Sequence, residues 1–261
     1  MRPLRLQTVT GELRYTRPRA RRRRVICTAA TGEHTGLLEI ALPPLREYAR
    51  RYRYDLVTVP HDTAFGRPAS WGRIPIIYRL LDSHELVVWI DADAIIVDLA
   101  RNIADELRTG KDLYLVEHHS QASGERTANA GVMMLRSGAW AKALLEAAWA
   151  RIDLIDHPWW ENAAIMQLLG YRTEVGSAGP EHHTEWRERT QLIDLAWNST
   201  PYYVASPTPV INHYGSIALD ERRRAMLTDL AGVAMHAGLR RSSEFKKSWP
   251  RPGRKHGRGF R

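Results

Sequence analysis

Cysteine and long apolar runs are scarce in this 261-residue sequence. Cys27 is the only cysteine, which excludes an internal disulfide and fits a reducing compartment. No segment approaches about 18 consecutive apolar residues, so we expect no membrane span. The N-terminal residues 1–8 lack the apolar stretch of a secretory signal, so export by that route is not expected. The sequence therefore predicts a cytoplasmic protein.

The composition is that of an ordinary globular protein, with 44% hydrophobic and 26% charged residues. Its net charge of +9 is concentrated in Arg17–Arg24 and Lys246–Arg261. Such runs are usually solvated; the alternative is contact with nucleic acid or an anionic surface. Because no recognised nucleic-acid module accompanies the charge, we expect no such partner. We predict a basic leader over 1–23, one domain over 24–240 and a basic flexible tail over 241–261. The oligomeric state is not predicted.

Apolar patterning predicts alternating strands and helices from residue 25 onward. The expected strands are 25–32, 54–59, 85–97, 112–116, 129–136 and 209–216. The expected helices are one that starts near Pro43-Pro44 and runs to Arg53, and others over 70–81, 99–109, 140–152 and 158–169. This order, with near-continuous apolar strands, indicates an α/β sheet covered by helices on both faces. The leader has room for one short edge strand.

Residues 117–128 are polar and lack periodicity, so we expect a mobile loop. His118 and His119 lie in it. They could reach a substrate or a metal, but adjacent histidines in a polar loop are more often solvated.

Two carboxylates, Asp91 and Asp93, interrupt the apolar run 85–97. Alternate residues of a strand share one face, so both side chains can converge on one point. Paired anions in apolar surroundings repel each other and are poorly solvated, and a divalent cation relieves both costs. The pair therefore predicts a site for Mg²⁺ or Mn²⁺ bridging to a diphosphate. The alternative is that the aspartates only turn the chain or cap a helix.

Two other candidate residues also have simple structural explanations. Glu161 lies at a predicted helix start, where an acidic side chain is an ordinary capping residue. His213 follows a short strand, where a lone histidine is usually just hydrogen-bonded. Its imidazole would suit Mn²⁺ beside two carboxylates if the fold brought it back to Asp91 and Asp93.

Five motifs in order over residues 25–216 resemble the galactosyl- and xylosyltransferase family, which contains fungal mannan-modifying α-glycosyltransferases and plant xyloglucan xylosyltransferases. The motifs are Tyr48–Val57, in which Arg53 stands where glycine is usual; Trp71-Gly-Arg73-Ile-Pro; Val88-Trp-Ile-Asp91-Ala-Asp93; Asn129-Ala-Gly131 with the following Trp140; and Trp160-Glu161-Asn162, where glutamine is commoner than Asn162. His213-Tyr-Gly215 adds the family's late histidine and glycine. The two tails lie outside the resemblance.

The resemblance implies a GT-A fold, a Rossmann-like mixed sheet flanked by helices. It also implies a nucleoside-diphosphate sugar donor, with a UDP-sugar favoured, a divalent cation and retention of anomeric configuration. Asp91, Asp93 and His213 would hold Mn²⁺ or Mg²⁺. The donor would contact Thr28, Ala29, Thr31, Arg73, Asp91, Ala92, Asn129, Gly131 and Gly215.

Glu161 and Asn162 are the catalytic candidates that the resemblance implies. Retention could use a covalent glycosyl-enzyme, for which Glu161 is the candidate carboxylate, or attack on the same face of the sugar. Asn162 would hydrogen-bond the donor or the reacting centre.

The first functional hypothesis is a glycosyltransferase that moves a hexose or pentose to a hydroxyl of a small-molecule or glycan acceptor, for example in antibiotic biosynthesis. The second is a nucleotidyltransferase or diphosphate hydrolase with the same metal site. The third is a non-catalytic binder that acts through its basic tails.

Overall fold

The computed structural model describes residues 14–15, 23–59 and 66–236. Most of the predicted leader and all of the predicted tail lie outside these residues. The strands are β1 (Arg14–Tyr15), β2 (Arg24–Ala29), β3 (Asp55–Val59), β4 (Leu86–Ile90), β5 (Ala94–Ile96), β6 (Leu113–His119), β7 (Arg126–Arg136), β8 (Tyr171–Arg172), β9 (Gly179–Pro180), β10 (Thr190–Ile193) and β11 (Ile211–His213). The α-helices are α1 (Thr35–Arg51), α2 (Arg73–Leu80), α3 (Ala139–Trp149), α4 (Trp160–Leu168), α5 (Glu185–Glu188) and α6 (Leu219–His236).

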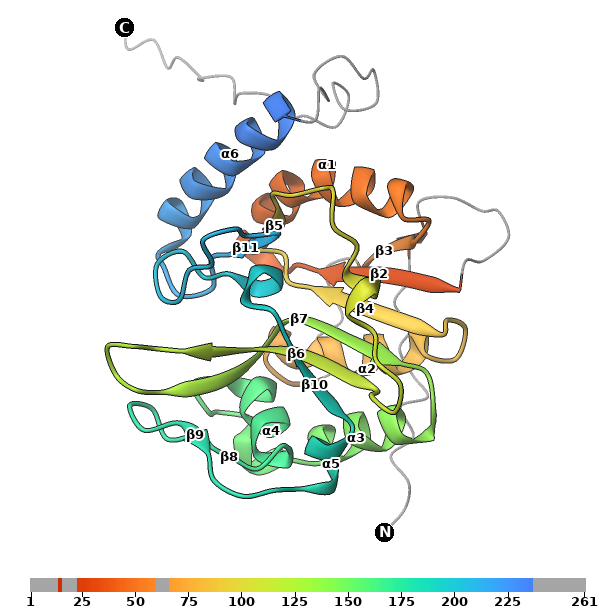
Figure 1. Ribbon diagram of the computed structural model, residues 1–261, viewed down its shortest axis with the longest axis vertical. Helices are drawn as coiled ribbons and strands as arrows, with labels where there is room; N and C mark the ends of the chain where they lie inside the picture. The colour runs from red at the N-terminus through yellow and green to blue at the C-terminus, as the bar shows by residue number, and fades with distance from the viewer. Residues whose placement is uncertain (1–13, 16–22, 60–65, 237–261) are drawn as a thin grey trace, which may run out of the picture.

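A mixed seven-stranded sheet runs through the middle of the molecule in the order β1-β3-β2-β4-β7-β6-β10. Strands β3, β2 and β4 are parallel, β7 is antiparallel to both β4 and β6, and β10 is parallel to β6. The edge strand β1 falls in the predicted leader. Helices α1 and α6 lie on one side of the sheet, and α2, α3 and α4 lie on the other (Figure 1). The predicted two-sided α/β architecture is confirmed.

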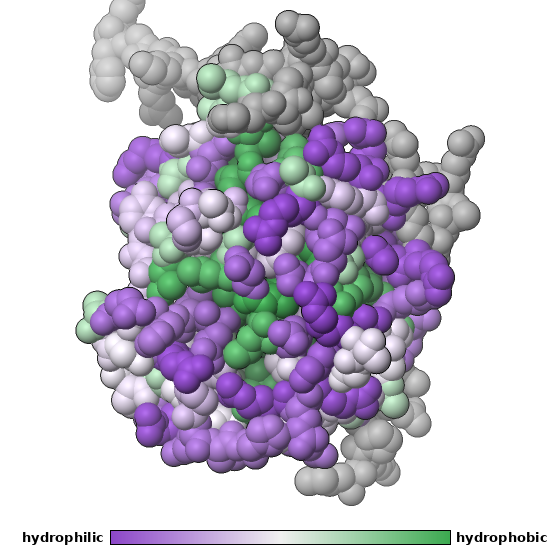
Figure 2. Space-filling model, viewed as in Figure 1, coloured by the Kyte–Doolittle hydropathy of each residue, from purple (hydrophilic) through white to green (hydrophobic). Residues whose placement is uncertain are grey.

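Burial on both faces explains the apolar strands. All five residues of β4 are buried, because its two faces belong to two different hydrophobic clusters, one packed on α1 and α6 and one on α2, α3 and α4. Hydrophilic residues cover most of the face in Figure 2, with hydrophobic residues showing between them near its middle. Within the described ranges, no helix is long and apolar enough to cross a membrane.

A second, two-stranded sheet pairs β5 with β11, antiparallel, and places His213 opposite Ala94. The predicted single strand 85–97 is therefore wrong. It is two strands, β4 and β5, in different sheets, with Asp91, Ala92 and Asp93 in the turn between them. The amide of Ala94 donates to the carbonyl of Asp91 over 3.1 Å, which closes this turn.

The predicted start of the first helix near Pro43-Pro44 is also wrong. Helix α1 begins at Thr35, and both prolines are buried inside it. Proline in a helix interior costs a backbone hydrogen bond, and the burial of most of the helix's apolar side chains offsets that cost. The predicted short helix over 99–109 is a 3₁₀ turn, Ile103–Glu106.

Half of the predicted loop 117–128 is strand: its first three residues end β6 and its last three begin β7, and residues 120–125 connect the two strands of this hairpin. Glu117 and Arg126 form an ion pair of 2.7 Å across the strands. His118, expected to be solvated, is buried and pairs with Thr127 in the ladder. Polar side chains hid this hairpin because its ladder forms from the backbone and needs no apolar alternation on both strands.

Candidate metal centre

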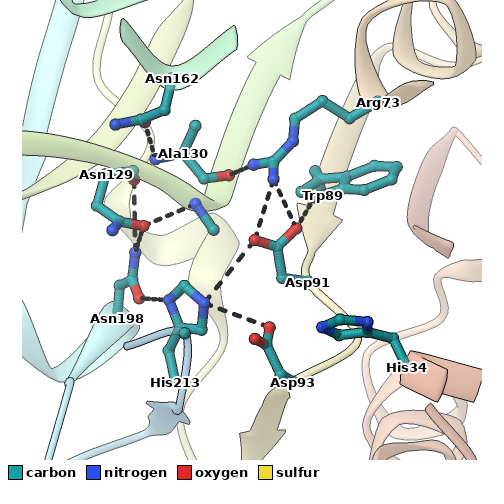
Figure 3. A network of polar contacts seen from close by, with 12 residues as sticks. His34, Arg73, Trp89, Asp91, Asp93, Asn129, Ala130, Asn162, Asn198 and His213 are labelled. Carbon is teal, nitrogen blue, oxygen red and sulfur yellow. Dashed lines mark hydrogen bonds and ion pairs between the residues drawn. The ribbon is translucent and has the colours of Figure 1, made fainter. Parts of the chain in front are cut away.

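Three potential metal ligands converge beside the turn between β4 and β5. One ligand atom each from Asp91, Asp93 and His213 lies within 4.8 Å of the other two. His213 Nε2 lies 3.8 Å from Asp91 Oδ2 and 3.4 Å from Asp93 Oδ1 (Figure 3). The pairing of β11 with β5 is the cause, because it seats His213 next to the turn from more than a hundred residues away in sequence. Two carboxylates and one imidazole suit Mn²⁺.

Asp91 is fixed by two neighbours. Trp89 Nε1 donates to Asp91 Oδ1 over 2.6 Å, and Arg73 Nη2 donates to Asp91 Oδ2 over 3.1 Å. The guanidinium of Arg73 also donates from Nη1 to the carbonyl of Ala130 over 2.6 Å, and its Nε lies 2.9 Å from Glu161 Oε1. Arg73 thus ties Asp91, Glu161 and strand β7 together from the first turn of α2.

Glu161 is 1% exposed. Burial raises the pKa of its carboxyl, and the guanidinium of Arg73 counteracts that rise. A carboxylate this deep, with an arginine against it, is well placed to orient Arg73.

An irregularity in β7 forms the wall behind the ligands. Leu115 and Val116 are consecutive in β6 but pair with Met133 and Asn129, so residues 130–132 have no partner on β6. Bulges of this kind often re-aim the backbone beside functional sites. Here the freed amide of Ala130 donates to Asn162 Oδ1 over 2.8 Å, and the freed carbonyl accepts from Arg73. The side chain of Asn162 therefore holds the bulge from α4.

Gly131 lets His213 approach the backbone of β7. A Cβ atom on Gly131 would lie 2.2 Å from His213 Cε1 and 2.6 Å from Nδ1, which is not sterically possible without movement. Gly215 lies near the same ring, and a Cβ there would be 3.0 Å from Nε2. The glycines at both positions reflect space and not a left-handed backbone.

The remaining donor candidates lie next to the aspartate turn. Thr28 is buried at the end of β2, Ala29 is the last residue of that strand, and Thr31 follows at the start of a 3₁₀ turn. Ala30 packs against Ala92, so this segment borders the site. Asn129 Oδ1 accepts from the backbone amide of Gly131 over 2.8 Å.

Arg222 and Asn198 belong to the site although the sequence did not point to them. Arg222, from α6, donates to Asp93 Oδ2 over 2.7 Å and to the carbonyls of Gly215 and Ile217. In the sequence, Arg222 lies in a run of charged residues that is typical of a solvent-exposed helix face. Asn198 is completely buried against His213, whereas in the sequence it is only part of a formal Asn-Ser-Thr sequon.

The charges of the site explain its protonation. Burial alone would favour a neutral Asp93, but His213 and Arg222 together hold the pKa of this carboxyl far below its usual range. Burial likewise opposes protonation of His213, and the two aspartates outweigh it and raise the pKa of the imidazole. Three carboxylates face the guanidinium groups of Arg73 and Arg222. A histidine that binds a cation is neutral. In that form of the site the three carboxylates exceed the two guanidinium groups by one negative charge, so a bound divalent cation would make the site positive and attractive to an anionic ligand.

No family model matches the chain. The chain is 28% identical over 135 residues to a protein named probable glycosyltransferase 6 from Oryza sativa subsp. japonica, and the match covers 48% of this chain and 27% of that protein. A protein of the same name from Oryza sativa subsp. indica matches with the same identity and coverage. The chain thus spans well under half the length of the curated relatives that it matches.

Two solved structures share the fold over most of their length. A glycosyltransferase involved in the glycosylation of the major capsid of PBCV-1 has a TM-score of 0.59 at 15% identity, covering 78% of this chain and 98% of that one. The galactosyltransferase LgtC, solved with donor and acceptor sugar analogues, has a TM-score of 0.51 at 12% identity, covering 86% and 99%. The chain therefore has the GT-A fold of glycosyltransferases, as the sequence predicted.

Proposed function

We propose that this chain is a metal-dependent, retaining glycosyltransferase. It moves a hexose or pentose from a nucleoside-diphosphate sugar, with a UDP-sugar favoured, to a hydroxyl of a small-molecule or glycan acceptor. One observation carries the proposal: on a GT-A fold, Asp91, Asp93 and His213 bring two carboxylate oxygens and an imidazole nitrogen within 4.8 Å. The role in natural-product biosynthesis and the cytoplasmic location stay predictions from the sequence.

Asp91, Asp93 and His213 would hold the divalent cation, Mn²⁺ or Mg²⁺. When bound, the cation supplies positive charge to the departing nucleoside diphosphate. Arg73 keeps Asp91 oriented by its bond from Nη2. Arg222 places the second guanidinium group of the site against Asp93, and we propose that Arg222 also contacts the diphosphate. Thr28, Ala29, Thr31 and Ala92 on one side, and Asn129, Gly131 and Gly215 on the other, are the proposed donor contacts.

Glu161 and Asn162, the catalytic candidates from the resemblance, are proposed as positioning residues, and the burial of Glu161 favours same-face attack over a covalent intermediate. A nucleophile must reach the anomeric carbon, whereas Glu161 is 1% exposed with Arg73 against it. Glu161 then acts by fixing Arg73, and Asn162 by fixing the backbone of Ala130 at the edge of the donor site.

The proposal is tested by incubating the full chain with UDP-, GDP- and dTDP-sugars, with and without Mn²⁺. We expect slow, Mn²⁺-dependent release of a nucleoside diphosphate from one of these donors. Asp91→Asn and Asp93→Asn should abolish it, and Asp82→Asn, at an exposed pair with Lys142, should not. Release of a nucleoside monophosphate or pyrophosphate would instead establish the nucleotidyltransferase or hydrolase alternative.

A separate variant tests the role of Glu161. Glu161→Ala should still bind Mn²⁺, because Glu161 is not among the converging ligands, but lose most transfer. Normal turnover in Glu161→Ala would exclude the role proposed for this residue.

A further inference from the structure

Asn198 lies at the centre of a buried polar network behind His213. It ends the 3₁₀ turn Leu195–Asn198 and has no exposed surface. Its Nδ2 lies 2.9 Å from Asn129 Oδ1, and its Oδ1 lies 3.0 Å from His213 Nδ1 (Figure 3). Its carbonyl lies 2.6 Å from His118 Nε2, which anchors the backbone. A side chain with this much buried hydrogen bonding is strongly oriented.

The orientation of each group in this network follows from one backbone amide. The amide of Gly131 can only donate, so the Asn129 atom 2.8 Å away is the oxygen Oδ1. An oxygen that faces Asn198 requires the amide nitrogen of Asn198 in return. The other end of Asn198 is then its oxygen, which can only accept. Consequently the nitrogen of His213 that faces it, Nδ1, must carry a proton.

A proton on Nδ1 leaves Nε2 of the neutral ring with its lone pair, and Nε2 is the atom that faces both aspartates. The opposite tautomer would point an N–H bond at the position of the cation. Histidine ligands commonly donate their other ring nitrogen to an oxygen acceptor, which fixes tautomer and ring orientation. Gly131 serves twice, because it starts the network and leaves space for the ring.

We infer that Asn198 is a positioning residue: oriented through Asn129 by the amide of Gly131, it holds His213 with Nδ1 protonated and Nε2 free to bind a divalent cation. This inference rests on the proposed function for the identity of the ligand, a divalent cation. The protonation of Nδ1 itself follows from the network alone.

The first experiment observes the ring directly. In metal-free full chain with ¹⁵N-labelled histidine, long-range ¹H–¹⁵N correlation spectra report which nitrogens of His213 carry protons. The spectra are recorded at a pH high enough to keep the ring of His213 neutral, and a proton on Nδ1 with none on Nε2 is the expected result. A neutral ring protonated on Nε2 alone would overturn the inference, whether or not the chain is a glycosyltransferase.

The second experiment measures Mn²⁺ affinity by calorimetry without any donor. Asn198→Ala removes the acceptor and should weaken binding by about 10- to 100-fold, the usual effect of losing such a partner. Asn198→Asp keeps an acceptor for Nδ1–H but sets an oxygen against Asn129 Oδ1, so it should recover part of that loss, whereas a merely structural role would make a buried charge the worse change. The matched control is Asn212→Ala, because Asn212 precedes His213 but bonds to Asp229.

We expect Asn212→Ala to bind Mn²⁺ as the unchanged chain does. Unchanged affinity in Asn198→Ala, or equal losses in Asn198→Ala and Asn212→Ala, would overturn the inference. If the unchanged chain binds no Mn²⁺, the proposed function fails, and the spectra still decide the protonation of Nδ1. If Asn198→Ala does not fold, the spectra and the Asn198→Asp variant decide.

Discussion

Replacing Arg222 by glutamine should destabilise the metal-free chain and increase the stabilisation that Mn²⁺ provides. In the metal-free chain Arg222 Nη1 lies 2.7 Å from Asp93 Oδ2, and both side chains are 11% exposed. Removing one partner of a buried ion pair costs about 3–5 kcal/mol. His213 remains 3.4 Å from the other oxygen of Asp93, so we expect a smaller loss, about 2–3 kcal/mol.

A bound cation would supply the charge that the variant lacks. In saturating Mn²⁺ the penalty should shrink to about 1 kcal/mol, which corresponds to the lost hydrogen bonds to the carbonyls of Gly215 and Ile217. The remaining difference of about 1–2 kcal/mol corresponds to roughly five- to thirtyfold tighter Mn²⁺ binding by Arg222→Gln.

Urea unfolding of both proteins, with and without Mn²⁺, measures all four free energies. Arg224→Gln is the matched control, since Arg224 is exposed on the same helix and should change stability by less than about 0.5 kcal/mol. Equal stabilisation of Arg222→Gln and the unchanged chain by Mn²⁺ would refute the view that Arg222 neutralises Asp93 in place of a cation.

Three further predictions follow from single residues. Arg53 has a φ of 60° at the end of α1, so Arg53→Gly should raise the free energy of unfolding by about 0.5–1 kcal/mol in urea titrations; a loss of stability would contradict this. Burial lowers the pKa of His118 from 6.5 to about 4. The unfolded chain therefore takes up this proton first, and about 3 kcal/mol of stability should be lost as the pH falls from 6.5 to about 4; His118→Gln should flatten that dependence, and an unchanged slope would count against it. Gly131→Ala should displace His213 and abolish measurable Mn²⁺ binding in calorimetry, with Gly215→Ala milder because its Cβ would meet the ring at 3.0 Å; comparable Mn²⁺ affinity in Gly131→Ala and the unchanged chain would disprove the close packing.

The parts of the site that sequence could predict are those with a short local pattern. Asp91 and Asp93 interrupt an apolar run, and a paired charge there is costly without a ligand. Arg53 lies outside the site, and the sequence marked it only as standing where glycine is usual. There the chain reverses at the end of α1, with Tyr54 donating to the carbonyl of Ala49 and Arg53 to that of Arg50, a motif that prefers glycine at this position. This geometry explains why the resembling family usually has glycine there.

The parts that sequence could not predict depend on contacts between distant segments. The pairing of β11 with β5 carries His213 to the aspartates. It cannot be read from the sequence, because β11 is only three residues long and its partner strand is far away in the chain. The three-residue irregularity in β7 is invisible for the same reason, since it exists only relative to β6. Arg222 and Asn198 acquire their roles solely through burial, and neither residue type signals its burial in the sequence.

Crystals of the full chain grown with Mn²⁺ and UDP provide the most direct test of the central claim. Anomalous diffraction at the manganese edge should place one ion in contact with Asp91, Asp93 and His213 Nε2, with the diphosphate of UDP on the same ion. An ion and nucleotide bound elsewhere, with Asp91 still paired to Arg73 and Asp93 to Arg222, would contradict the account.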